Sequence, residues 1–294
     1  MEYTHHYQGQ PIFQYSIHRH SALAQYFRWF QIYERPFTDK RIQNQIEIFH
    51  ENIIVESISN TAKGALEYKD KLKGFDGTKN AHHVQDIEVK PINENLLQLT
   101  ADIIYQGIRN NDQPVNSRIH YQTTLSSQKN ELPLFTNIKL SHRGEATPQS
   151  YKDAYPRNRA TSLMHYWLYL IETARGNASV FRELLADDFQ LNLSSKNTIN
   201  TWDQFETWIT SVNTSIIASA HFEKNLSATE NADGSITMTV DFDWQGLNNE
   251  YQPMIASTHH TWTLDNDLDN RFARIRKMDV ETVTPFQVVE ATHA

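Results

Sequence analysis

The chain has 294 residues, a net charge of −8 and 39% hydrophobic residues, enough for one large packed domain or two ordinary ones. An acidic chain is a poor partner for nucleic acid, because that affinity rests on neutralising phosphates. The lack of cysteine excludes disulfides, thiolate nucleophiles and cysteine-based zinc sites. No segment approaches the ~18 apolar residues of a membrane span, and no basic region precedes an apolar run at the start. We therefore expect no membrane partner, no signal peptide and a cytoplasmic location.

An internal repeat organises the sequence. Residues 100–125 recur at 239–264 without a gap, at an offset of 139, with ten identical pairs that include Asp102/Asp241, Gln106/Gln245, Gly107/Gly246 and His120/His259. Elsewhere Trp29 pairs with Trp167, Glu34 with Glu172, and Ala81-His82 with Ala220-His221. A long period with two copies predicts tandem domains. We expect an N-terminal extension (1–20), a first copy (21–142), a linker (143–157), a second copy (158–286) and a tail (287–294).

The two copies show the same order of elements. Each opens on an amphipathic helix, with Tyr26, Trp29, Phe30 and Tyr33 in the first copy at i, i+3, i+4, i+7. A second helix follows, capped by Thr38 in the first copy, and leads into a short strand. A third helix is predicted at 65–75 and again at 201–212, where Thr201 and Gln204 form a capping box. Three alternating strands close each copy, and Asp233-Gly234 marks a hairpin.

This order resembles the nuclear-transport-factor-2-like superfamily, most clearly at 184–193 (LLADDFQLNL) and at the strand pair 239–264. The resemblance covers both copies and implies an α+β fold: two tandem cone-shaped domains, each a curved, mostly antiparallel sheet packed on three helices around an apolar pocket. The family includes ketosteroid isomerases, SnoaL-like polyketide cyclases and scytalone dehydratase, as well as members without catalysis. The isomerases' general base falls on Leu193 here, and on Ser57 in the first copy. Neither residue can abstract a proton at neutral pH.

Strand alternation predicts which side chains face the helices. One face of 97–107 is apolar from Leu97 to Tyr105, and its counterpart runs from Ile236 to Trp244. With turns near Asn111 and Glu250, two cross-strand pairs are expected on the outer face: Asp102 with His120, and Asp241 with His259. We interpret them as an interdomain interface, where two similar copies meet as an internal pseudo-dimer. A catalytic dyad or half a metal site is the alternative reading.

Inward aromatic residues define the predicted ligand pockets: Tyr26, Trp29, Tyr33, Tyr105 and Tyr121 in the first copy, and Trp167, Trp244 and Trp262 in the second. His83 is expected to face inward because the repeat pairs it with Phe222, and His260 takes the place of Tyr121. These two histidines are the candidate catalytic residues, with satisfied core groups as the alternative. His82 and His221 are expected on the outer face.

The function stays open between two classes. One hypothesis is an acid–base enzyme of isomerase, cyclase or dehydratase type that binds a small, largely apolar organic molecule in one or both pockets. The other is a non-catalytic binding or scaffolding protein whose pockets are filled by aromatic side chains. No phosphate-binding loop, dinucleotide fingerprint or H-E-x-x-H motif occurs, so neither a cofactor nor a metal is expected. Further homo-oligomerisation is left open.

Overall fold

A computed structural model describes residues 2–75, 77–108, 114–128, 131–147, 149–195 and 197–290. The chain divides into two compact units. The first-copy unit comprises Ser21–Ser162 and Leu268–Arg271. The second-copy unit comprises Met1–His20, Leu163–Asp267 and Phe272–Ala294. The helices α1 (Ile12–Glu34) and α4 (Tyr155–Thr173) therefore each contribute one part to either unit.

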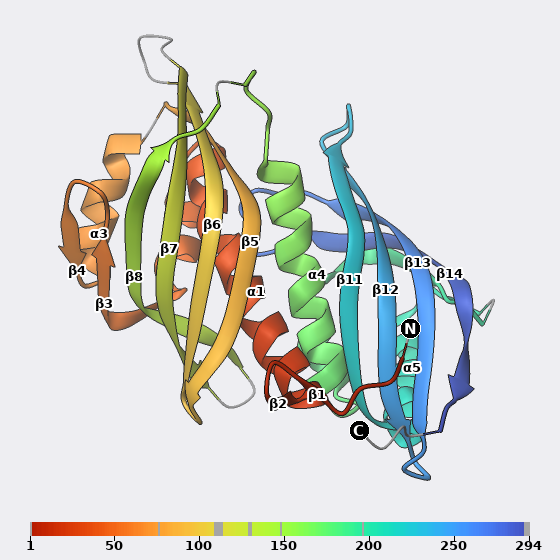
Figure 1. Ribbon diagram of the computed structural model, residues 1–294. Coiled ribbons are helices and arrows are strands. Elements are labelled where there is room, and N and C mark those ends of the chain that lie inside the picture. The colour runs from red at the N-terminus through yellow and green to blue at the C-terminus, as the bar shows by residue number, and fades with distance from the viewer. Residues whose placement is uncertain are drawn as a thin grey trace. The chain divides into compact units, whose positions relative to one another are not determined.

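A six-stranded sheet forms the first-copy unit, in the order β4-β3-β8-β7-β6-β5 (Figure 1). Only β3 and β8 pair in parallel. The strands are β3 (Phe49–Glu56), β4 (Thr61–Lys63), β5 (Lys79–Asn93), β6 (Leu96–Ile108), β7 (Pro114–Gln128) and β8 (Glu131–Glu145). The helices besides α1 and α4 are α2 (Asp39–Ile46) and α3 (Ala65–Leu72), the latter followed by a 3₁₀ turn (Lys73–Phe75). Side chains of α1 pack on the inner face of this sheet to form the core.

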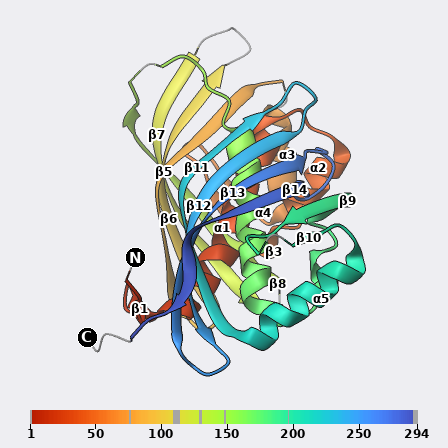
Figure 2. The ribbon, with the colours of Figure 1, turned by 90° about the vertical axis from the view of Figure 1, so that its right-hand side faces the viewer.

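The second-copy unit has the same strand order, β10-β9-β14-β13-β12-β11, with β9 and β14 parallel. Figure 2 shows its long strands sweeping in a curve. The strands are β9 (Leu185–Asn192), β10 (Thr198–Ile199), β11 (Ile216–Glu230), β12 (Ile236–Asn248), β13 (Pro253–Asp265) and β14 (Arg274–Val288), with a small ribbon of β1 (His6–Tyr7) and β2 (Gln10–Pro11). Helix α5 (Trp202–Ser215) follows β10. Both units therefore have the predicted α+β architecture.

Two details of the predicted element order are wrong. Four long strands, not three, follow the last helix of each copy. In the second copy the predicted second helix is a single 3₁₀ turn (Ala178–Phe181), because only a few residues separate the Asn177 cap from β9.

The predicted capping and turn signals are confirmed. The Thr38 side chain accepts a hydrogen bond from the Arg41 amide and starts α2. Thr201 does the same for the Gln204 amide at the start of α5, and the Gln204 side chain accepts from the Asn200 amide. Gly234 adopts φ +83° in the hairpin between β11 and β12, a conformation that favours glycine. The predicted turn near Asn111 lies outside the described residues.

The predicted faces of the central strands are confirmed as well. Leu97, Leu99, Ala101 and Ile103 are buried in the first copy, and Ile236, Met238, Val240 and Phe242 in the second. Asp102 pairs with His120 across β6 and β7, and Asp241 with His259 across β12 and β13.

The repeated Gln-Gly dipeptide has a structural reason. Gln106 faces outward, yet it is 3% exposed, because it binds the Lys152 amide and the Ser150 carbonyl of the segment before α4. Gln245 likewise binds Thr4 and Glu2 before α1. A Cβ on Gly107 would meet the Tyr105 hydroxyl at 2.6 Å, and one on Gly246 would meet the Trp244 ring at 2.4 Å. Each dipeptide therefore anchors a chain segment on one face and admits an aromatic ring on the other.

Among the described residues, no helix is long and apolar enough to cross a membrane.

The cap of α5 gives a first prediction. Thr201→Ala removes the acceptor for the Gln204 amide, so it should lower the free energy of unfolding by about 1 kcal/mol. Thr207→Ala makes the same change inside the same helix, where alanine is favoured, and should cost nothing. Urea unfolding of both variants measures the difference. Equal losses would show that Thr201 does not act as the cap.

Candidate functional site

A cavity of about 430 Å³ opens within the first-copy unit, a size typical of small-molecule sites. Its lining is largely apolar and aromatic, with a few polar groups: Trp29, Tyr33, Val55, Ser57, Ile58, Ser59, Asn60, Ala62, Tyr68, Lys71, Leu72, Phe75, Asn80, His82, Tyr105, Ile119, Tyr121 and Leu140. Of the predicted pocket residues, Trp29, Tyr33, Tyr105 and Tyr121 line it. Tyr26 does not, because its ring is buried against Phe30 and Tyr121 in the core.

Tyrosine hydroxyls supply much of the polarity of this cavity. The hydroxyls of Tyr33 and Tyr68 hydrogen-bond each other, and the Tyr105 hydroxyl donates to Asn80 Oδ1 at 2.5 Å. Burial raises the pKa of Tyr33, Tyr68 and Tyr121 well above the usual value for a phenol. These three side chains therefore stay protonated at neutral pH and can donate hydrogen bonds.

The lining histidine is His82, and it is fixed by a buried carboxylate. Glu34, the last residue of α1, has a fully buried side chain. Its Oε1 accepts from the His82 backbone amide at 2.8 Å and lies 3.0 Å from His82 Nδ1. Asn158, on α4, donates to both oxygens of Glu34 at 2.9 and 3.1 Å and to the His82 carbonyl at 3.0 Å. Residues of two helices, Glu34 on α1 and Asn158 on α4, therefore fix the position of the His82 ring.

The remaining ring nitrogen of His82 is available to a ligand. The ring stacks on Phe30, with centroids 4.6 Å apart, and lies beside Tyr33 and Tyr105. Within the described parts of the chain, its ring hydrogen bonds are made through Nδ1 alone. An imidazole held by a carboxylate at one nitrogen and open at the other is the arrangement of a general base.

The expected orientation of His83 is wrong, and a β-bulge is the reason. Strand β5 pairs His82 with Tyr105 and His83 with Ile104, and its register shifts between Val84 and Asp86. The extra residue shifts the alternation of inward and outward side chains by one position. His82 therefore faces the cavity and His83 faces outward, where its Nε2 lies 3.0 Å from Gln106 Oε1. His221 is reversed in the same way: it pairs with Trp244, and β11 is irregular between Lys224 and Ser227.

The second-copy unit contains the same pair in different surroundings. His221 Nδ1 lies 2.9 Å from Oε1 of Glu172, whose side chain is fully buried. Ser16, on α1, donates to the same oxygen at 2.9 Å and accepts from the His221 amide. Burial raises the pKa of Glu172, against the hydrogen bonds from His221 and Ser16. The Glu and His residues that the two copies share therefore form one Glu–His dyad in each unit. The repeat shows both pairs as identical residues, but nothing in the sequence indicates that Glu and His are in contact.

Two buried histidines extend the network of the second-copy unit. His20 Nδ1 and His165 Nδ1 are 2.8 Å apart, and His20 Nε2 lies 3.1 Å from the His221 carbonyl. Burial lowers the pKa of His165 to about 3, and burial together with neighbouring positive charge lowers the pKa of His20. Beside them Arg19 Nη1 donates to Glu223 Oε2 at 2.6 Å. Burial opposes ionisation of Glu223, but the Arg19 charge outweighs it and holds the pKa at about 2.

His260 faces inward, as expected, but both of its ring nitrogens are occupied. Nδ1 accepts from the Trp262 indole at 3.3 Å, so Nε2 carries the proton and donates to Thr258 at 2.9 Å. Burial lowers the pKa of His260 to about 3. Trp167, Trp244 and Trp262 are buried, and Trp167 packs on Trp262. These are the contacts of a filled aromatic core.

A different hollow, of about 490 Å³, lies along α5 and β10 of the second-copy unit. Polar side chains such as Asn197, Asp203 and Thr207 line much of it. Neither Glu172 nor His221 is among its lining residues.

The outer Asp–His pairs are formed as predicted. His120 Nδ1 lies 2.8 Å from Asp102 Oδ1, and His259 Nδ1 lies 2.6 Å from Asp241 Oδ1. The His259 hydrogen bond lowers the pKa of Asp241. Their role at an interdomain interface stays a prediction. In the described ranges, no group of three or more His, Asp or Glu side chains is placed to hold a metal ion.

Neither a protein-family model nor a curated protein matches the chain. Solved structures with a similar fold include the hexachlorocyclohexane dehydrochlorinase LinA-type3 from Novosphingobium barchaimii, with 13% identity, a TM-score of 0.40, and coverage of 47% of this chain and 92% of that one. ActVI-ORFA from Streptomyces coelicolor shows 15% identity and a TM-score of 0.36, covering 43% of this chain and 96% of that one. At these identities and scores the likenesses say nothing of the chemistry here.

The strand order and the helices on the inner face decide the fold. Both units have the nuclear-transport-factor-2-like fold. The resemblance seen in the sequence is confirmed at this level, in two tandem copies.

The buried histidines predict a pH dependence. Because the folded-state pKa of His165 is about 3 and its ordinary value is 6.5, the unfolded chain binds more protons between these values. The free energy of unfolding should therefore fall as the pH drops below about 6.5, by up to about 1.4 kcal/mol per pH unit for each such histidine. Urea unfolding between pH 7 and pH 4 measures this slope.

Two variants test whether the pH dependence of the free energy of unfolding arises from His165. His165→Gln can still hydrogen-bond His20 but does not titrate, so its slope should be shallower than that of the wild type. His142→Gln removes an exposed histidine and should leave the slope unchanged. Equal slopes in wild type and His165→Gln would show that His165 does not control acid stability.

Proposed function

We propose that the first-copy unit binds a small, flat, largely apolar organic molecule in its cavity and catalyses proton transfer on it. The observation that carries this proposal is the His82 ring, which lines the cavity and is held at Nδ1 by the buried Glu34. The substrate class that fits best is a cyclic ketone or a related enolisable ring compound.

Size and lining support the binding step. A cavity of about 430 Å³ accommodates a molecule of one or two fused rings. Trp29, Tyr68 and Phe75 offer ring faces and edges, and the exchange of water for these surfaces favours binding of an aromatic or alicyclic body.

The chemistry follows from the positions of base and donors. His82 Nε2 takes a proton from a carbon next to the carbonyl, and the carboxylate of Glu34 stabilises the imidazolium that forms. The negative charge moves to the substrate oxygen, where a protonated tyrosine hydroxyl can donate a hydrogen bond. Tyr33, Tyr68 and Tyr121 are the lining donors that burial keeps protonated. Return of the proton to a carbon or loss of a leaving group completes an isomerisation or an elimination.

For the second-copy unit we propose a non-catalytic, structural role. Its Glu172 carboxylate is bound by Ser16 as well as by His221, and Trp167 packs on Trp262 in its core. This is the filled-pocket alternative, applied to one unit.

Proton exchange into a model ketone tests the proposal. In D₂O, the wild type should accelerate exchange of the α-protons of 2-tetralone, followed by loss of their ¹H NMR signals. His82→Ala should lower the enzymatic rate by about 10²- to 10⁴-fold, the usual contribution of a general base. Glu34→Gln should lower it less, because the ring loses its charged partner but keeps its place.

The adjacent histidine supplies a matched control. His83→Ala should retain the wild-type exchange rate, because that side chain lies on the outer face. His82→Ala should also retain the rise in melting temperature caused by 2-tetralone, since the cavity persists. Exchange that is as fast in His82→Ala as in the wild type would overturn the catalytic role while leaving binding intact.

A further inference from the structure

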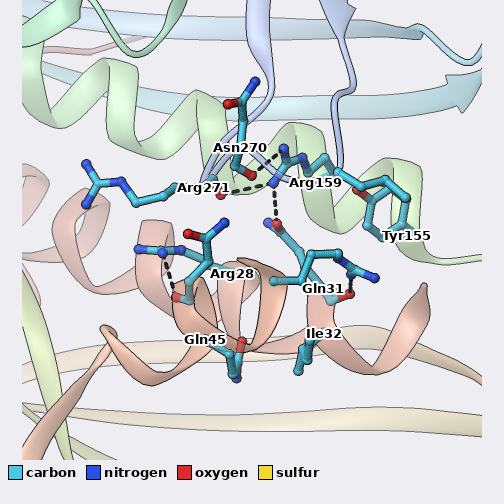
Figure 3. A pocket seen from close by; sticks show the side chains of 11 residues that line it. Arg28, Gln31, Ile32, Gln45, Tyr155, Arg159, Asn270 and Arg271 are labelled. Carbon is cyan, nitrogen blue, oxygen red and sulfur yellow. Dashed lines mark hydrogen bonds between the residues drawn. The ribbon is translucent and has the colours of Figure 1, made fainter. Parts of the chain in front are cut away.

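A second, much smaller cavity of the first-copy unit lies between α1, α2, α4 and the segment Leu268–Arg271 (Figure 3). Its volume of about 20 Å³ admits one water-sized occupant. The residues that line it are Arg28, Gln31, Ile32, Arg41, Asn44, Gln45, Tyr155, Arg159, Leu268, Asn270 and Arg271. None of them lines the cavity of His82.

The lining is strongly cationic. It contains four arginines and, among the described lining residues, neither Asp nor Glu. Three of the arginines are almost completely buried: Arg28 is 4% exposed, Arg41 5% and Arg159 2%. Buried charges are normally paired, because their desolvation is costly.

Backbone carbonyls take up much of the hydrogen bonding of these guanidiniums. Arg159 donates to the carbonyls of Asn270 and Arg271, each at 2.9 Å. Arg41 donates to the carbonyls of Pro36 and Gln31. A carbonyl is a dipole and leaves the net charge in place.

Charged groups outside the lining also act on these arginines. Arg28 pairs with the carboxylate of Glu47, which also lies 3.5 Å from Arg271. Burial lowers the pKa of Arg41, and the positive charges of Arg159 and Arg35 lower it further. Tyr155 and Asp269 act in the opposite direction and raise it. Within the described lining itself, the charged side chains are the four arginines.

Gln31 contributes a buried donor that lacks an acceptor. The residue is 6% exposed, and its Nε2 has no hydrogen-bond partner in the described structure. Its Oε1 accepts from Arg159 Nη1 at 2.6 Å, as Figure 3 shows. A flipped amide would press its NH₂ group against a guanidinium, so the amide orientation is fixed and Nε2 must donate elsewhere.

We propose that this cavity binds a small inorganic anion of the size of chloride. A monatomic anion accepts hydrogen bonds from every direction, matches the single-occupant volume and has the charge opposite to that of the four lining arginines. Water fits less well, because it accepts only two hydrogen bonds, whereas an anion can accept from Gln31 Nε2 and from several guanidinium groups at once. The anion ties Gln31 of α1 to the arginines of the first-copy unit and stabilises that unit. The site does not depend on the proposed activity.

Bromide crystallography tests the site directly. Crystals of the full-length wild type in sodium bromide should show an anomalous peak in the cavity, within contact distance of Gln31 Nε2. A cavity with a light-atom peak and no anomalous signal would mean bound water and would overturn the proposal.

Thermal unfolding at constant ionic strength tests it in solution. Replacement of sodium gluconate by sodium chloride should raise the melting temperature of the wild type saturably, because the anion binds the folded state. Gln31→Glu places a carboxylate oxygen where Nε2 stood, so it should melt higher than the wild type in gluconate and lose the chloride response. Gln14→Glu makes the same change at an exposed position of α1 and should keep that response. A chloride response equal in all three proteins, or absent from the wild type, contradicts the proposal.

Discussion

The hydrogen bond between His82 and Glu34 is the constraint on which the candidate site depends. A buried carboxylate costs several kcal/mol unless its oxygens are satisfied. The oxygens of Glu34 are hydrogen-bonded to the His82 amide, the His82 ring and the Asn158 side chain. This network joins the end of α1, the start of β5 and the start of α4. Loss of any one partner would remove one of the hydrogen bonds that satisfy this buried carboxylate.

The repeat presents the same dyad in two surroundings. In the first-copy unit, His82 borders a cavity whose aromatic walls leave space for a ligand. In the second-copy unit, Ser16 donates to Glu172 and accepts from the His221 amide, and Trp167 packs on Trp262. The same dyad therefore lies in two different surroundings, and we propose the reaction for the one that borders the cavity.

Much of this architecture could be predicted from the sequence, because the repeat and the strand alternation are strong signals. The outer Asp–His pairs and the buried faces of the central strands follow from parity alone. The prediction from strand alternation is wrong at His83, because the bulge beside Val84 exchanges the inward and outward positions of β5. No residue type in the sequence indicates this bulge. Glu34 and His82 were visible as identical pairs of the repeat, but their contact joins a helix end to a distant strand, which spacing cannot reveal.

The proposed role of His82 is tested most directly by ¹⁵N NMR of the histidine side chains during addition of 2-tetralone. This role predicts that the Nε2 resonance of His82 shifts with saturation while those of His221 and His260 stay in place. The His82 signal can be assigned from its absence in His82→Ala. A His82 resonance that does not respond while the ligand binds, or a shift confined to His221 or His260, would contradict it.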